Sequence, residues 1–179
     1  ILKRLLRLNQ VSSNPRIIDE SYDLIPPKLK ETIKIIDKAK QENSKVIVWT
    51  NFVSNVDFIT KNIGSNAVGI HGKKDLDEIN KLINIFQKND KINVLVATPG
   101  VAKEGLTLTE ANYAIFFDRD FSLDSYLQAQ DRINRMSQEK TCYIYKLLTK
   151  NSIDYWIDSL IEAKKIVARY AQGDITNDE

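Results

Sequence analysis

Residues 45–52 read Lys-Val-Ile-Val-Trp-Thr-Asn-Phe, a short apolar run that ends in polar residues. A run of this kind, rich in β-branched residues, is typical of a strand buried in a parallel sheet. Similar runs recur at 67–70, 92–97, 113–117 and 142–148. Helical patterns separate them, at 53–63, 75–88 and 123–136, and a further helix is expected to start at Pro26-Pro27 and to end before Glu42. This alternation predicts an α/β fold whose mainly parallel sheet carries helices on both faces.

Polar residues follow four of the predicted strands. In chain order these are Thr50-Asn51, the stretch 71–74, the stretch 98–100 and the stretch 118–120. Parallel α/β sheets place their chemistry at the carboxyl ends of the strands. The pattern therefore predicts a functional site along that edge.

Residues 125–136 read Ser-Tyr-Leu-Gln-Ala-Gln-Asp-Arg-Ile-Asn-Arg-Met. On one helix, Gln128, Arg132 and Arg135 would share a face. A guanidinium stays charged when desolvated and matches the oxygens of a phosphate, which suits an arginine finger. This interpretation requires both guanidiniums to face the groove at the strand ends. The alternative is a solvated helix face with salt bridges to Asp131, and the spacing alone leaves both open.

Four stretches resemble motifs of the Snf2-like branch of superfamily 2 helicases and translocases. Residues 128–138 are similar to motif VI, commonly Q-A-x-D-R-x-H-R-I-G-Q, with Asn134 in place of the usual His and Ser137 in place of the usual Gly. Residues 45–52 resemble motif IV, residues 97–109 resemble motif V, and residues 118–123 resemble the link between motifs V and VI. Together, and in this order, they identify the chain as similar to the C-terminal lobe of such a motor, of the bacterial or phage type.

The resemblance implies a RecA-like three-layer sandwich that forms the second lobe of an ATP-driven motor on double-stranded DNA. ATP and Mg²⁺ would be held mainly by a first lobe, because the sequence contains neither a G-x-x-x-x-G-K-[ST] phosphate loop nor a D-E-A-H-like acidic box. The expected partners are double-stranded DNA and the chain's own N-terminal RecA-like lobe. The chain alone is expected to be inactive as an ATP hydrolase.

The resemblance also assigns roles to individual residues. Catalytic contacts to ATP are expected from Arg132, Arg135 and Gln128. The ATP side of the lobe interface is expected to include Gly105, Glu104 and Asp131. Contacts to the DNA backbone are expected from Asn51, His71, Gly72, Lys73, Thr98 and Gly100.

Other interpretations stay open at this stage. The chain could be the second lobe of a DEAD- or DEAH-type RNA helicase, although those usually have a glycine where this chain has Asp131. It could also be a RecA-like module that binds without catalysis. Locally, residues 98–109 could be an ordinary loop between strand and helix, and the cations of 71–74 could simply be solvated.

Composition sets broad limits. The chain has 26 basic and 24 acidic residues among 179, so its bulk charge of +2 neither supports nor excludes a nucleic-acid partner. With one cysteine and one histidine, a Cys/His metal site and an internal disulfide are not expected. Cys142 is interpreted as a buried strand thiol. The sequence offers no membrane-spanning run and no signal peptide, so a cytoplasmic location is expected, whereas the oligomeric state stays open.

The predicted organisation has three parts. Residues 1–23 are expected to form a short helix and a linker that leads from the first lobe, with an unpartnered, poorly ordered apolar side. Residues 24–150 would be the lobe, and residues 151–179 a C-terminal amphipathic helix and acidic tail. The apolar stripe of that helix, which either packs on the domain or meets another lobe or partner, comprises Ile153, Trp156, Leu160, Ala163, Val167 and Tyr170. A first residue other than Met suggests a piece of a longer protein.

Overall fold

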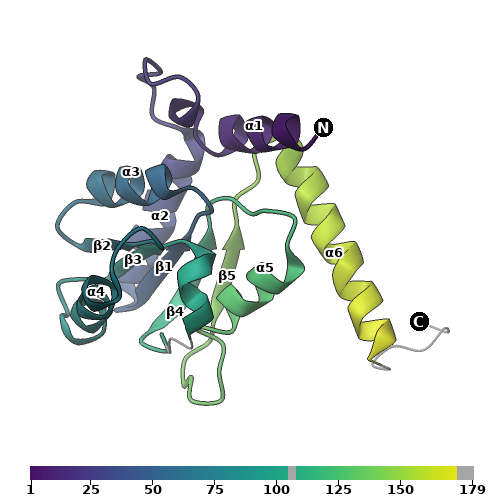
Figure 1. The fold of residues 1–179 in the computed structure, drawn as a ribbon. Helices are drawn as coiled ribbons and strands as arrows, with labels where there is room; N and C mark the ends of the chain where they lie inside the picture. The colour runs from purple at the N-terminus through teal and green to yellow at the C-terminus, as the bar shows by residue number, and fades with distance from the viewer. Residues whose placement is uncertain (105–107, 173–179) are drawn as a thin grey trace.

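The computed structural model describes residues 1–104 and 108–172. Within these ranges a five-stranded sheet lies at the centre, in the strand order β2-β3-β1-β4-β5 (Figure 1). All neighbouring strands are parallel. The strands are β1 (Lys45–Trp49), β2 (Ala67–Ile70), β3 (Val94–Ala97), β4 (Ala111–Phe116) and β5 (Tyr143–Lys146). The predicted α/β fold with a parallel sheet is confirmed.

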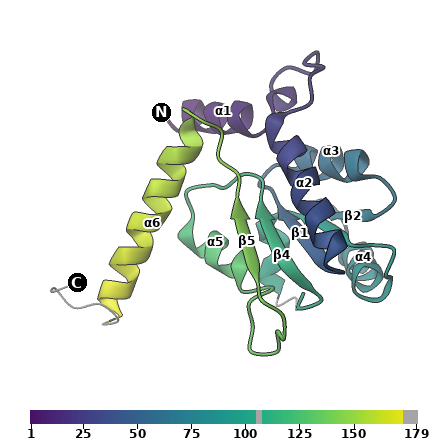
Figure 2. The ribbon, with the colours of Figure 1, turned by 180° about the vertical axis from the view of Figure 1, so that it is seen from behind.

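Helices cover both faces of this sheet. One face carries α2 (Pro27–Gln41) and α3 (Val53–Ile63), which Figure 2 shows from behind. The other face carries α4 (Leu76–Lys88), α5 (Leu123–Gln130) and α6 (Ile153–Ala171). Two short 3₁₀ turns, η1 (Pro15–Ile17) and η2 (Pro99–Glu104), and the N-terminal helix α1 (Leu2–Ser13) complete the described elements.

The central strand β1 shows why the sequence forms two cores. Val46 and Val48 point into the core under α2 and α3. Ile47 and Trp49 point into the core under α4 and α5. Successive side chains of a strand alternate between faces, so an unbroken apolar run fills both layers at once.

Side-chain caps set several helix starts. The Asp75 carboxylate accepts a hydrogen bond from the Glu78 amide at 2.7 Å and begins α4. Ser122 and Ser152 cap α5 and α6 in the same way. Pro27 occupies the first turn of α2, where no backbone donor is required. Such caps satisfy amides that have no partner within the helix, and they place these helix starts within two residues of the predicted ones.

Two predicted elements differ from the structure. The helix expected over 123–136 ends at Gln130, and residues 131–137 form turns. Strand β5 is an edge strand, so Tyr143 and Ile144 are exposed and Cys142, before it, is only half-buried. The prediction that Cys142 is a buried strand thiol is therefore wrong, because Cys142 precedes an edge strand that no further strand covers.

The packing face of α6 also differs from the predicted stripe. Its buried residues are Asp154, Ile157 and Ile161, whereas Trp156 and Val167 are exposed. The helix leans away from the sheet along its length, so that its last turns stand clear of the body (Figures 1 and 2). The start of α6 is attached through a polar contact, the buried ion pair of Asp154 with Lys28 at 2.7 Å.

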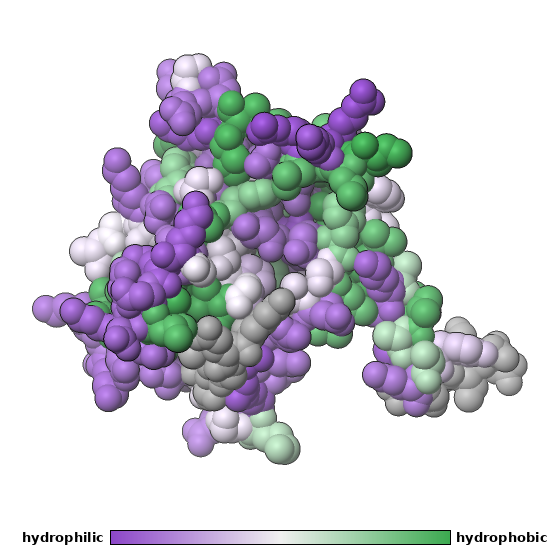
Figure 3. Space-filling model, in the orientation of Figure 1, coloured by the Kyte–Doolittle hydropathy of each residue, from purple (hydrophilic) through white to green (hydrophobic). Residues whose placement is uncertain are grey.

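Helix α1 is attached by its polar side. Asn9 and Ser13 are buried, whereas Leu2 is 82% exposed and Leu6 is also exposed. Figure 3 shows this apolar surface gathered over α1 and the start of α6. The expected poor order of this stretch stays a prediction, and Leu2, Leu6, Leu8 and Val11 of α1 are exposed.

Candidate functional site

The carboxyl edge of the sheet brings most of the predicted DNA-contacting residues together. Asn51 follows β1, His71 follows β2 and Thr98 follows β3. These three strands are neighbours in the sheet, so their ends lie side by side. The Thr98 amide donates to the Ile70 carbonyl at 3.3 Å, which ties two of these ends together.

The predicted DNA-contacting residues at these strand ends form the edge group, which comprises Asn51, His71, Gly72, Lys73, Thr98 and Gly100. Their side chains differ in exposure to solvent. His71 is 8% exposed, its Nδ1 accepts from the Lys73 amide at 3.3 Å, and its Nε2 lies 3.7 Å from Asp57 Oδ1. The imidazole therefore stabilises the turn at 71–73, of which it is part. Lys73 and Gly72 are exposed at the tip of the same turn. A Cβ on Gly72 or Gly100 would meet nothing within 4 Å, so both positions are open to a ligand backbone.

The predicted ATP-contacting arginines lie beyond the end of α5. Arg132 Nε donates to the Gln128 carbonyl at 3.2 Å, and Arg135 Nε donates to the Asp131 carbonyl at 3.0 Å. Each guanidinium is thus held by the carbonyl four residues earlier, without a continuous helix. Burial, followed by the charge of Arg135, lowers the pKa of Arg132, and the exposed Asp131 carboxylate partly offsets this. The two cations are close enough to repel one another.

Gln138 anchors the turns at 131–137 that carry Arg132 and Arg135, which we call the arginine segment. The sequence alone did not single out Gln138. Its Nε2 donates to the carbonyls of Thr109 at 3.0 Å, Ala111 at 2.9 Å and Ile133 at 3.2 Å. Ile133 is fully buried between the two arginines. A Gln at the end of the motif was visible in the sequence, but two of its three acceptors, Thr109 and Ala111, come from distant residues.

The arginine segment does not lie at the carboxyl edge. Gln138 reaches the start of β4, and the Leu108 amide donates to the Arg132 carbonyl at 3.2 Å. A crossover helix runs back along the sheet, so residues after α5 return to the amino end of the strands. The expectation that the guanidiniums join the groove at the strand ends is therefore wrong. Gly105 and the side chain of Glu104 lie outside the described residues.

Asp118 is a second functional candidate, which the sequence placed at the strand-end edge without assigning it a role. It directly follows Phe117 at the end of β4 and is 3% exposed. Its Oδ1 accepts from the Asn51 amide at 2.7 Å. An acidic residue directly after a buried strand was the available signal, because such a carboxylate must find several donors.

Within residues 1–104 and 108–172, no group of three or more His, Cys, Asp or Glu side chains could hold a metal ion. None of the helices described there combines the length and apolar character that crossing a membrane requires.

Comparison with known proteins defines the class. Residues 27–137, more than half of the chain, match the family described as "Helicase conserved C-terminal domain". The chain therefore belongs to this family.

Individual relatives narrow the branch to Snf2-like proteins. The chain is 27% identical over 140 residues to the "ATP-dependent helicase fft3" of Schizosaccharomyces pombe, covering 76% of this chain and 15% of the relative. It is 28% identical over 149 residues to the "SWI/SNF-related matrix-associated actin-dependent regulator of chromatin subfamily A containing DEAD/H box 1A" of Danio rerio, covering 82% of this chain and 15% of the relative. The chain thus spans about 15% of the length of these curated relatives.

Solved structures of SWI2/SNF2 ATPase cores share the fold of this chain. The "Sulfolobus solfataricus SWI2/SNF2 ATPase core in complex with dsDNA" superimposes with a TM-score of 0.78 at 28% identity, over 93% of this chain and 36% of that chain. The corresponding core domain without DNA in its title gives a TM-score of 0.77 at 27% identity, over 99% and 36%. The chain is a C-terminal, RecA-like lobe of the Snf2-like superfamily 2 type. Since fungal, animal and archaeal proteins match, a bacterial or phage origin is not singled out.

Proposed function

We propose that this chain is the second motor lobe of an ATP-dependent Snf2-like DNA helicase or translocase. The observation that carries the proposal is the match of residues 27–137 to the helicase C-terminal family, since Arg132 and Arg135 are anchored as a pair but lie away from the strand-end groove. Curated relatives named ATP-dependent helicases support ATP use by the parent protein. A related ATPase core solved with double-stranded DNA supports duplex DNA as the partner.

The arginine segment fits a polyphosphate. Two cations three residues apart raise each other's electrostatic energy, and an anion between them would relieve that repulsion. Their anchoring by backbone carbonyls reduces the freedom lost when phosphate is bound. When bound on the first lobe, ATP with Mg²⁺ supplies the transferable phosphoryl group. Arg132 and Arg135 would stabilise negative charge that develops on it, with Gln128 and Asp131 beside them.

The carboxyl edge fits a DNA backbone. Asn51, Gly72, Lys73, Thr98 and Gly100 lie at three neighbouring strand ends. They offer an amide, a hydroxyl, a cation and two positions without side chains, a set that contacts phosphate and sugar without reading bases. His71 supports this group by shaping the turn that carries Lys73. The helical turn η2, which directly follows Thr98, packs beside α5.

The test is the ATPase activity of the parent protein. Arg132→Ala and Arg135→Ala are expected to lower kcat on the order of a thousandfold, while affinity for duplex DNA stays within about twofold. The matched control is Arg169→Ala, an exposed arginine near the end of α6. Stimulation by duplex DNA, and not by RNA, is expected. Stimulation by RNA instead, or full activity of both variants, would refute the proposal.

A further inference from the structure

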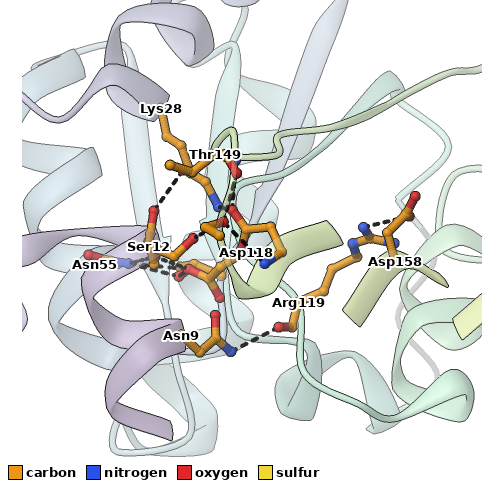
Figure 4. A network of polar contacts seen from close by, with 12 residues as sticks. Asn9, Ser12, Lys28, Asn55, Asp118, Arg119, Thr149 and Asp158 are labelled. Atoms are coloured by element: carbon orange, nitrogen blue, oxygen red, sulfur yellow. Dashed lines mark hydrogen bonds and ion pairs between the residues drawn. The ribbon is translucent and has the colours of Figure 1, made fainter. Parts of the chain in front are cut away.

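The Asp118 carboxylate joins three elements through four hydrogen bonds. Oδ2 accepts from Ser13 Oγ at 2.6 Å, from Thr50 Oγ1 at 2.6 Å and from Asn55 Nδ2 at 3.2 Å. Oδ1 accepts from the Asn51 amide at 2.7 Å. Figure 4 shows this network between α1, the end of β1 and α3. One buried side chain thus contacts both the N-terminal helix and the proposed DNA-contacting loop.

All four donors are neutral, which makes the arrangement sensitive to geometry. A buried carboxylate is stable only while its hydrogen bonds are made. When one donor is lost, the remaining donors must compensate the negative charge of the carboxylate alone. Asn55 Nδ2 also donates to Ser13 Oγ at 2.8 Å, so Ser13 and Asn55 move together.

Helix α1 depends on this polar network for its attachment. Asn9 Nδ2 donates to the Arg119 carbonyl at 3.0 Å, and Asn14 Nδ2 donates to Asn55 Oδ1 at 2.9 Å. Leu2, Leu6 and Leu8 of α1 are exposed, so little apolar burial reinforces these bonds. Attachment by hydrogen bonds, each of modest net strength, can be released and re-formed.

We infer that Asp118 is a positioning residue that couples the seating of α1 to the placement of Asn51. One carboxylate oxygen is held by Ser13 of α1 and the other holds the Asn51 amide. Release of Ser13 lets the carboxylate rotate and loosens Asn51. The inference deepens the proposed function, on which the DNA-contacting role of Asn51 rests.

Amide hydrogen exchange tests the coupling without any DNA. In the purified chain, Ser13→Ala is expected to speed exchange of the Asn51 amide about tenfold relative to that of Phe86 in α4, which reports global opening. The control is Ser65→Ala, an exposed serine in the turn before β2 that belongs to neither α1 nor the Asp118 network. Equal Asn51 exchange in the two variants would overturn the inference.

Duplex DNA affinity tests the functional half by a double-mutant cycle. Ser13→Ala is expected to weaken binding of a fluorescent DNA duplex several-fold in the native background and to have no further effect beside Asn51→Ala. Additive losses would overturn the coupling. If Asn51→Ala binds like the native chain, the proposed DNA contact fails, and the exchange comparison still decides whether Asp118 couples α1 to Asn51.

Discussion

At the scale of single residues, the sheet edge nearest α3 depends on Gly69. A Cβ built there would lie 2.7 Å from Thr60 Oγ1 and 2.9 Å from Val56 Cγ1, both on α3. Such overpacking forces the helix away from β2. We expect Gly69→Ala to lower the free energy of unfolding by about 1–3 kcal/mol, measured by urea denaturation. Gly72→Ala, with nothing within 4 Å, is the control for stability, and equal losses in the two variants would contradict this reading.

Gln138 gives a second prediction at this scale. Gln138→Glu keeps the shape of the side chain but replaces the donor with an acceptor that faces three carbonyls. We expect a loss of about 1–3 kcal/mol in the free energy of unfolding. The neighbouring exposed Glu139→Gln should leave stability within about 0.5 kcal/mol. A Gln138→Glu chain as stable as its control would show that these contacts do not hold the arginine segment.

At the scale of elements, helix α6 is fastened by acidic residues. Burial alone would raise the pKa of Asp158, but hydrogen bonds from Lys146 and Arg119 hold it below its ordinary value. Glu162 and Asp154 likewise have lowered pKa values despite their burial, Glu162 through Lys165 and Lys146, and Asp154 through its 2.7 Å ion pair with Lys28. Three of the contacts of α6 therefore require ionised carboxylates.

Acidification is expected to weaken this attachment. A carboxylate whose pKa is lower in the folded state stabilises the fold above its unfolded pKa, near 4, and that contribution is lost as pH falls through the folded pKa. We expect the free energy of unfolding to fall below about pH 4, measured by urea denaturation between pH 7 and pH 3. Asp158→Asn should be less stable at pH 7 and less sensitive to acid. An unchanged pH dependence in that variant would contradict the assignment.

The elements also show what sequence patterns can and cannot predict. The residues of β2 and α3 matched the prediction because local apolar periodicity and a following Gly64 define them. The end of α5 at Gln130 was missed because Gln138 and Leu108 draw the next residues onto β4, a contact between distant segments. The packing face of α6 and the network around Asp118 were missed for the same reason. The edge group at the strand ends was predictable because parallel topology alone brings those ends together.

At the scale of the whole molecule, the nearly balanced charge predicts how DNA binding responds to salt. Each phosphate neutralised by a cation contributes a slope of about −0.9 to the logarithm of affinity against the logarithm of salt concentration. The cation of the proposed edge group is Lys73, since Lys74 is paired with Glu78 in α4. The dependence of duplex affinity on salt should therefore be shallow despite the 26 basic residues of the chain.

Lys73→Ala makes that prediction specific. Its removal should weaken duplex binding alike for all sequences and make the salt slope shallower by about 1, because a phosphate contact carries no base information. Lys40→Ala, an exposed lysine in the last turn of α2 and thus beside the amino ends of the strands, should leave the slope unchanged. The measurement is fluorescence anisotropy of a labelled duplex from low to physiological salt. An equal change of slope in both variants would mean that DNA is attracted by diffuse charge and not by the carboxyl edge of the sheet.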